Sequence, residues 1–157
     1  MSRPALSGVG KGRRFCLVVS RFNEPVTESM ATAARECLIA HGVEPEAVRM
    51  VEVPGAWELA QAVGWVLDAG DVDGVIALGC VIRGETPHFE YISLAATLGL
   101  EAIAREAGVP VTFGVLTTDD GAQARARSGG AKGNKGEDAA LAALEMCALA
   151  EELRGSS

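Results

Sequence analysis

Short apolar runs alternate along the chain with longer segments whose apolar residues recur at helical spacing. The run Phe15–Ser20 is almost continuously apolar, which predicts a strand buried on both faces within a parallel sheet. Comparable runs predict three further strands, at 48–53, 72–78 and 111–117.

Between these strands, apolar residues three and four positions apart predict helices. Pro25 begins the first helix and Gly42 ends it, because glycine accepts the left-handed conformation that often follows a helix. The same spacing predicts helices at 56–70, 88–107, 122–127 and 137–153, with a glycine-rich loop at 128–136. This alternation predicts a single-domain α/β fold: a three-layer α/β/α sandwich with a four-stranded parallel sheet, flavodoxin-like in type.

Length and charge narrow the choice of partners. The 157 residues suit one domain, which we expect at 15–157 after a flexible N-terminal tail at 1–14. The net charge of −7 argues against nucleic acid, because phosphate backbones attract basic surfaces. No apolar run approaches the ~20 residues that a membrane-spanning helix needs, so we expect no membrane partner.

The four cysteines are widely spaced and form neither a C-x-x-C pair nor a metal-like pattern with histidine. Cys16, Cys37 and Cys147 have apolar neighbours, which is typical of buried free thiols in a reducing cytoplasm. We therefore expect a cytoplasmic protein without a bound metal. Cys80 lies beside the loop described next, where a catalytic thiol is the less favoured interpretation.

The segment Gly79–His88 carries the strongest chemical signal. An apolar strand ends there in glycines, and Thr86 and Pro87 then suit the N-cap and first position of a helix. Free backbone N–H groups at such a helix start attract phosphate. His88 follows in the first turn, so a group suited to proton transfer lies beside an anion site. This pattern indicates an enzyme that acts on a small phosphorylated molecule.

Other side chains have both a structural and a functional interpretation. Phe22 follows a strand and either covers the core or stacks on a planar ring. Arg127 is either an ordinary surface residue or a phosphate ligand. For the rest the structural interpretation suffices: a favourable helix dipole at Glu58 and Asp138, core packing at Phe113, and solvation at Lys135.

Five motifs occur in a fixed order and together cover nearly all of the chain beyond residue 14. They are Ser20–Asn23, Val53–Leu59, Gly79–Tyr91, Phe113–Thr118 and Gly133–Gly136. In this combination the chain resembles the 6,7-dimethyl-8-ribityllumazine synthase family of riboflavin biosynthesis.

The resemblance implies a condensation that needs no cofactor. The substrates are the small molecules 5-amino-6-(D-ribitylamino)uracil and 3,4-dihydroxy-2-butanone 4-phosphate. The amine attacks the ketone to form an imine, phosphate leaves by elimination, and the ring closes with loss of water. The product is 6,7-dimethyl-8-ribityllumazine, the precursor consumed in the last step of the pathway.

The resemblance also implies a role for each candidate residue. His88 transfers protons, and Phe22 stacks on the substrate ring. Many relatives carry glutamate where this chain has Asp138. The other implied contacts are Ala56, Trp57 and Glu58 with the ribityl chain and ring, the backbone of Cys80, Val81 and Ile82 with the pyrimidine, Glu85, Thr86 and Arg127 with phosphate, Phe113 from a neighbouring subunit, and Lys135 and Asp138 near the pocket.

Members of the family assemble as pentamers, and some pack twelve pentamers into an icosahedral shell. Shell formers carry Gly-x-Lys-x-Gly-Asn-Lys-Gly before the last helix. Here residues 129–136 read Gly-Gly-Ala-Lys-Gly-Asn-Lys-Gly, with the first lysine shifted by one position. We expect a homo-oligomer and favour a shell over a pentamer or decamer. The resemblance further implies an association with riboflavin synthase.

Two alternatives share the same fold. One is a related enzyme that dismutates lumazine, which needs no phosphate site, so the turn at 84–88 and Arg127 argue against it. The other is a non-catalytic protein that binds lumazine or flavin, or forms a structural shell. Retention of His88, Phe22 and Arg127 argues against lost catalysis.

Overall fold

The structure is a computed structural model that describes residues 4–155. Its main sheet contains β1 (Phe15–Ser20), β2 (Val48–Val53), β3 (Gly74–Ile82) and β4 (Val111–Thr118). Every strand pair is parallel, and the spatial order is β2-β1-β3-β4. The four-stranded parallel sheet that the sequence predicts is therefore confirmed.

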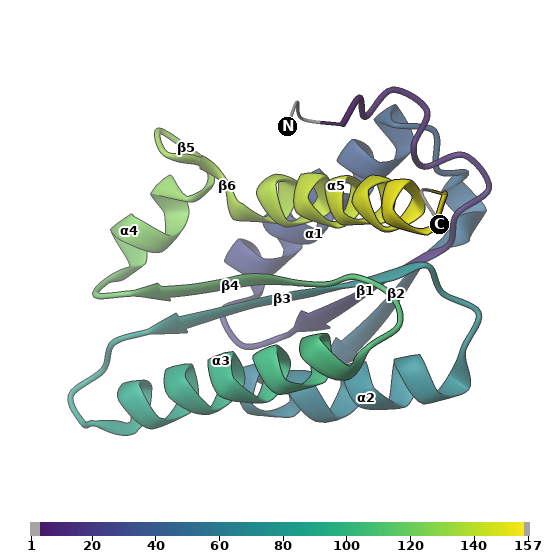
Figure 1. Cartoon of the computed structure of the whole chain (residues 1–157). Coiled ribbons are helices and arrows are strands. Elements are labelled where there is room, and N and C mark those ends of the chain that lie inside the picture. The colour runs from purple at the N-terminus through teal and green to yellow at the C-terminus, as the bar shows by residue number, and fades with distance from the viewer. Residues whose placement is uncertain (1–3, 156–157) are drawn as a thin grey trace.

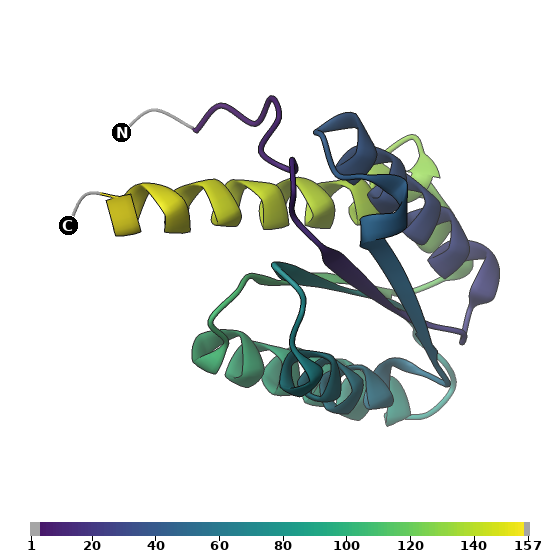
Figure 2. The ribbon, with the colours of Figure 1, turned by 90° about the vertical axis from the view of Figure 1, so that its right-hand side faces the viewer.

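Helices cover both faces of this sheet (Figure 1). One face packs against α1 (Glu24–Ala40) and α5 (Lys135–Gly155), and the other against α2 (Leu59–Ala69) and α3 (His88–Glu106). The view turned by 90° shows the same three layers (Figure 2). All six residues of β1 are buried, as its continuous apolar run predicts. The arrangement is the flavodoxin-like α/β/α sandwich.

Shorter elements complete the chain. Two 3-10 turns, η1 (Pro45–Ala47) and η2 (Ala56–Glu58), precede β2 and α2, and α4 (Gly121–Ala126) follows β4. The predicted loop at 128–136 instead contains a small antiparallel pair, β5 (Ser128–Gly130) and β6 (Gly133–Asn134). Backbone pairing in this glycine-rich stretch leaves no apolar pattern, so the sequence carries no strand signal there.

Two element boundaries near the predicted site differ from expectation. β3 continues to Ile82, past the expected end at residue 78, because its backbone stays paired with β4 as far as Thr118. α3 begins at His88 with Pro87 as its N-cap residue, so Thr86 lies one position before the cap. The expectation that Thr86 caps this helix is wrong by one residue.

Residues 6–13, near the N-terminus, pack against the rest of the domain. The side chains of Leu6 and Val9 contact the core under α1 and α5. The N–H of Gly10 donates to the carbonyl of His41 at 2.9 Å, and Arg13 pairs with Glu151 at 2.7 Å. This part of the expected flexible tail is thus ordered by apolar burial and hydrogen bonds. Residues 1–3 of that tail lie outside the described residues.

The described residues include no helix that is both long and apolar enough to cross a bilayer. Over the same residues, no group of three or more histidine, cysteine, aspartate or glutamate side chains is placed to hold a metal ion.

Gly136 allows α5 to approach α1 closely. A Cβ at this position would overlap the main-chain carbonyl of Met30, a buried residue in the middle of α1. We expect Gly136→Ala to lower the free energy of unfolding by about 1–3 kcal/mol, because neither backbone can move aside. Denaturant unfolding measures this difference.

The matched control is Gly64→Ala. Gly64 lies inside α2, and a Cβ there would meet no atom within 4 Å. This variant should gain roughly 0.5–1 kcal/mol from the better helix propensity of alanine. Equal stability of the two variants would contradict the close contact at Gly136.

The four thiols are all buried, and burial raises the pKa of each above its ordinary value of 9.0. For Cys37 and Cys80 the pKa rises to about 11. Between pH 9 and 11 the unfolded chain therefore loses thiol protons that the folded chain keeps. The stabilising contribution is complete below pH 9 and falls as the pH rises.

We expect the double variant Cys37→Ala/Cys80→Ala to lose less stability between pH 9 and 11 than the unmodified chain. Unfolding curves over this range, with both proteins in the same buffers, measure the two slopes. All other groups are common to both proteins, so the difference between the two slopes reports these two thiols. Parallel slopes would show that these thiols ionise as easily in the folded state as in the unfolded chain.

Candidate active site

The predicted site loops lie at the carboxyl ends of the strands, where the arrowheads end in Figure 1. The sheet order places β1 and β3 side by side, although their following helices lie on opposite faces. The chain therefore leaves the sheet in opposite directions at this point. Such a reversal opens a crevice outside the carboxyl ends of the strands.

A cavity of about 620 Å³ occupies this crevice, and we call it the substrate cavity. Its wall combines residues from the loops after β1 and β2, the end of β3, and the start of α3. The sequence-predicted residues that line it are Phe22, Ala56, Trp57, Glu58, Cys80, Val81, Ile82, Thr86 and His88. Residues distant in sequence are thus brought together as the motifs predicted.

Two large aromatic side chains stand at the substrate cavity without core contacts to hold them. Phe22 is 70% exposed and Trp57 is 65% exposed. Exposed aromatic groups beside a cavity are typical of surfaces that bind a planar ligand or a second protein. Of the two interpretations of Phe22, the structure excludes the one in which it covers the core.

The end of β3 presents an open backbone edge to the substrate cavity. β1 pairs with β3 only as far as Leu78, whereas β4 pairs with β3 as far as Ile82. The N–H of Arg83 donates to the Thr118 carbonyl at 2.8 Å on the β4 side. Because successive peptide groups of a strand alternate in direction, the N–H and C=O of Ile82 face the open β1 side.

Asn23 closes part of this edge. It adopts a left-handed conformation with φ 62° and ψ 47°, and its side-chain Nδ2 donates to the Cys80 carbonyl at 2.9 Å. The loop after β1, which we call the first loop, also donates two backbone hydrogen bonds toward the end of β2. Arg21 N–H donates to the carbonyl of Val53, and Phe22 N–H donates to that of Pro54. Phe22 is therefore held between the ends of β2 and β3.

The turn before α3 has the features of an anion site. α3 contains 19 residues, and its first backbone N–H groups carry the positive end of the helix dipole. The N–H of His88 reaches the Thr86 hydroxyl only at 3.5 Å, which is a weak contact. Glu85 lies in this turn but does not line the substrate cavity.

Arg83 ties this turn to its surroundings. Its Nε donates to Asp119 at 2.9 Å and its Nη1 to Glu90 at 3.2 Å, so it joins the end of β4 to the first turn of α3. The guanidinium also lies 4.6 Å from the ring centre of Phe89, which lines the substrate cavity. This network restrains the segment on which His88 stands.

The thiol of Cys80 is not arranged for catalysis. Only 1% of the residue is exposed, and burial raises the pKa of its thiol to about 11. A nucleophilic cysteine needs a lowered pKa and a cationic or basic neighbour. The geometry therefore agrees with the sequence, which made a catalytic thiol at Cys80 the less favoured interpretation.

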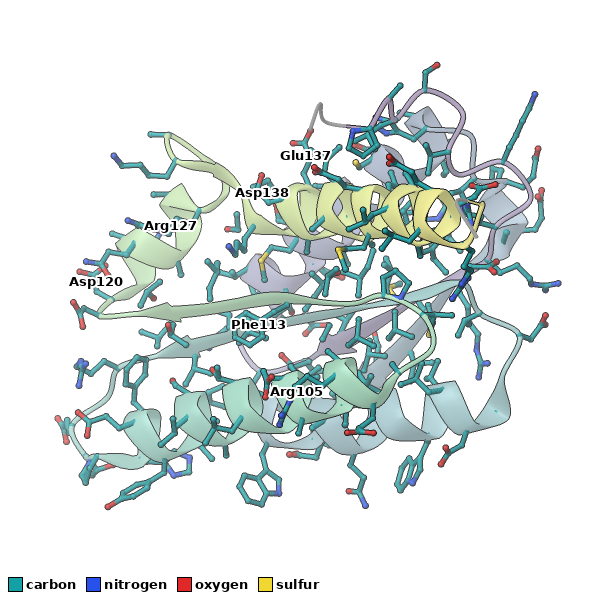
Figure 3. All side chains as sticks on the ribbon, in the orientation of Figure 1. Arg105, Phe113, Asp120, Arg127, Glu137 and Asp138 are labelled. Atoms are coloured by element: carbon teal, nitrogen blue, oxygen red, sulfur yellow. The ribbon has the colours of Figure 1, made fainter. Side chains whose placement is uncertain are left out.

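Three predicted residues lie elsewhere. Arg127, Lys135 and Asp138 line a separate cavity of about 320 Å³ at the end of β4, which we call the basic cavity. Figure 3 shows Arg127 and Asp138 on the α5 side of β4. α3, which begins with His88, lies across the sheet from them. The two cavities share no lining residue.

Phe113 lines neither cavity. It belongs to the edge strand β4, and 39% of it is exposed. Figure 3 shows its ring on the side of β4 that faces α3. Core packing accounts for only part of this side chain, so the simplest structural interpretation of Phe113 is incomplete.

Sequence reasoning missed several residues of the site. Phe89 and Ile92 line the substrate cavity from α3, and their helical spacing after His88 was the available signal. The sequence showed Asn23 only as the last residue of the motif Ser20–Asn23. Its contact with Cys80 gave no signal, because the two residues lie 57 positions apart. Arg83 gave no signal, since its carboxylate partners lie in α3 and in the turn after β4.

Comparison with known proteins gives consistent matches. A sequence model of the family described as 6,7-dimethyl-8-ribityllumazine synthase matches residues 12–151. A protein of that name from Salinibacter ruber is 49% identical over 144 residues, covering 92% of each chain. Another of that name from Gemmatimonas aurantiaca is 49% identical over 140 residues, covering 89% of this chain and 85% of the relative.

Proposed function

The chain belongs to the 6,7-dimethyl-8-ribityllumazine synthase family, and we propose that its reaction takes place in the substrate cavity once a second copy completes it. The protein is a lumazine synthase of riboflavin biosynthesis. This choice of site rests on one observation: Phe22, Glu58 and His88 all line the same cavity beside the start of α3.

The uracil ring lies against Phe22 and the open edge of β3. A planar heterocycle offers a face for stacking and an edge of alternating donors and acceptors. The N–H and C=O of Ile82, which face the open β1 side, supply the donor and acceptor that match this edge of the ring, as a neighbouring strand would. Glu58, half-buried at the end of η2, accepts hydrogen bonds from the ribityl hydroxyls.

The phosphorylated ketone binds with its phosphate at the turn 84–87. The helix dipole of α3 and the free N–H groups there favour the dianion. Once the primary amine of the uracil has formed an imine with the ketone, the adjacent carbon must lose a proton before phosphate leaves. His88 stands beside the anion site and takes this proton.

The basic cavity of a second copy completes the phosphate site. Arg127 and Lys135 supply positive charge that the substrate cavity of one chain lacks among its lining residues. The exposed ring of Phe113 likewise needs a partner surface. A site shared in this way makes the isolated chain inactive and requires a homo-oligomer, for which we propose pentamers.

We retain the shell as the favoured assembly of these pentamers and the cytoplasm as the location. The segment 129–136 supports the first, and the four unpaired buried thiols support the second. Sedimentation velocity or light scattering on the purified chain separates pentamer, decamer and shell by mass.

Mixing the purified chain with both substrates tests the proposed reaction. Product fluorescence and one phosphate released per lumazine formed are expected. Lumazine binding without turnover would identify a non-catalytic binding protein instead. Conversion of added lumazine without any phosphate release would identify the dismutating enzyme.

His88→Ala should slow turnover by no more than about 10²–10⁴-fold, the range for one acid–base group. An amine and a ketone condense without a catalyst, so holding the two substrates in register supplies much of the rate enhancement. Steady-state kinetics on the assembled variant give the value. Complete loss of activity in a folded, assembled variant would contradict the view that positioning of the substrates supplies much of the rate enhancement.

Arg127→Ala should mainly raise the apparent KM for the phosphorylated ketone, by about tenfold or more, because a charged hydrogen bond to phosphate is lost. Arg125→Ala is the matched control, since Arg125 lies in the last turn of α4, just before the C-cap residue Arg127, is exposed, and lines neither cavity. Similar KM values for the two variants would exclude Arg127 from the phosphate site.

A further inference from the structure

Asn23 is placed where a helix-capping side chain is expected, yet it does not cap. It is the N-cap residue of α1, and its carbonyl accepts from the N–H groups of Val26 and Thr27. Asparagine is among the best N-cap residues because its side chain accepts a free N–H of the first turn. Here no side-chain cap hydrogen bond forms. The carboxamide is used instead across the crevice.

The backbone of Asn23 is held in an uncommon conformation. Of the described residues other than glycine, Asn23 and Asp71 have positive φ values, 62° and 63°. Such a conformation costs free energy, and it persists where surrounding contacts impose it. At Asn23 those contacts are the backbone hydrogen bonds of the first loop to Val53 and Pro54 on one side and the Cys80 contact on the other.

The Cys80 contact replaces a missing strand pair. β1 and β3 are neighbours in the sheet (Figure 1), but their pairing stops at Leu78. Beyond it, the Cys80 carbonyl would otherwise face the crevice without a strand partner. The acceptor is a carbonyl oxygen, so only the NH₂ group of the Asn23 carboxamide can serve it. This hydrogen bond of 2.9 Å fixes the distance between the first loop and the end of β3.

We infer that Asn23 is a positioning residue for the uracil substrate. Its carboxamide sets the gap between the Phe22 ring and the open β3 edge, and the substrate ring must fit that gap. The inference rests on the proposed function of the substrate cavity. The proposed phosphate site is the turn before α3, whose hydrogen-bond contact between His88 and Thr86 does not involve Asn23.

Two variants separate the carboxamide from the backbone conformation. Asn23→Gly accepts the positive φ freely but has no donor. Asn23→Asp keeps the shape and tolerates the same conformation, but its carboxylate can only accept and so repels the Cys80 carbonyl. Both should raise the KM for the ribitylaminouracil about five- to tenfold, with Asp at least as severe as Gly. The KM for the phosphorylated ketone should change less than about twofold.

Asp71→Gly is the matched control, because it makes the same backbone change outside both cavities. Its kinetic constants should equal those of the unmodified chain. Thermal unfolding and light scattering on every variant identify loss of folding or assembly, and KM is compared among assembled proteins. If one Asn23 variant does not assemble, the other decides.

The outcomes are distinct for each idea. An unmodified chain that forms no lumazine would overturn the proposed function. An active chain whose two Asn23 variants keep the original KM for the uracil would overturn the positioning role alone. Equal changes in the KM of both substrates would also overturn it, since they indicate a general loosening of the site.

Discussion

The chain leaves β1 and β3 toward opposite faces of the sheet, and this reversal determines where the cavity forms. Right-handed crossovers place α1 on one face of the sheet and α2 and α3 on the other. The loops that leave the two central strands must then diverge, and the substrate cavity forms between them. The continuous burial of β1 and β3 makes this frame rigid.

The same constraint explains why so much of the site is backbone. β3 extends past the last residue paired with β1, so its edge is left with unused hydrogen-bonding groups beside the cavity. Asn23 satisfies one of them from within the chain. In our proposal the substrate ring satisfies others, which relates an incomplete strand pair directly to ligand recognition.

Charge is divided between two cavities, and this division relates the fold to assembly. The start of α3 provides a helix dipole, but no lysine or arginine lines the substrate cavity. Arg127 and Lys135 stand across the sheet in the basic cavity. In our proposal, an acidic chain of net charge −7 binds a phosphorylated substrate by bringing together the substrate cavity of one copy and the basic cavity of another.

The pattern of residues was enough to predict the α/β class, the four parallel strands and the loops at their ends, because apolar periodicity reports burial and the motifs are local. The motifs also identified most of the residues that line the substrate cavity, but not Phe89 or Ile92. Three features could be seen only in the folded chain: the start of α3 at His88, the contact of Asn23 with Cys80, and the separation of Arg127 from His88. Each depends on which distant backbone groups meet, and a linear pattern of side chains does not encode that.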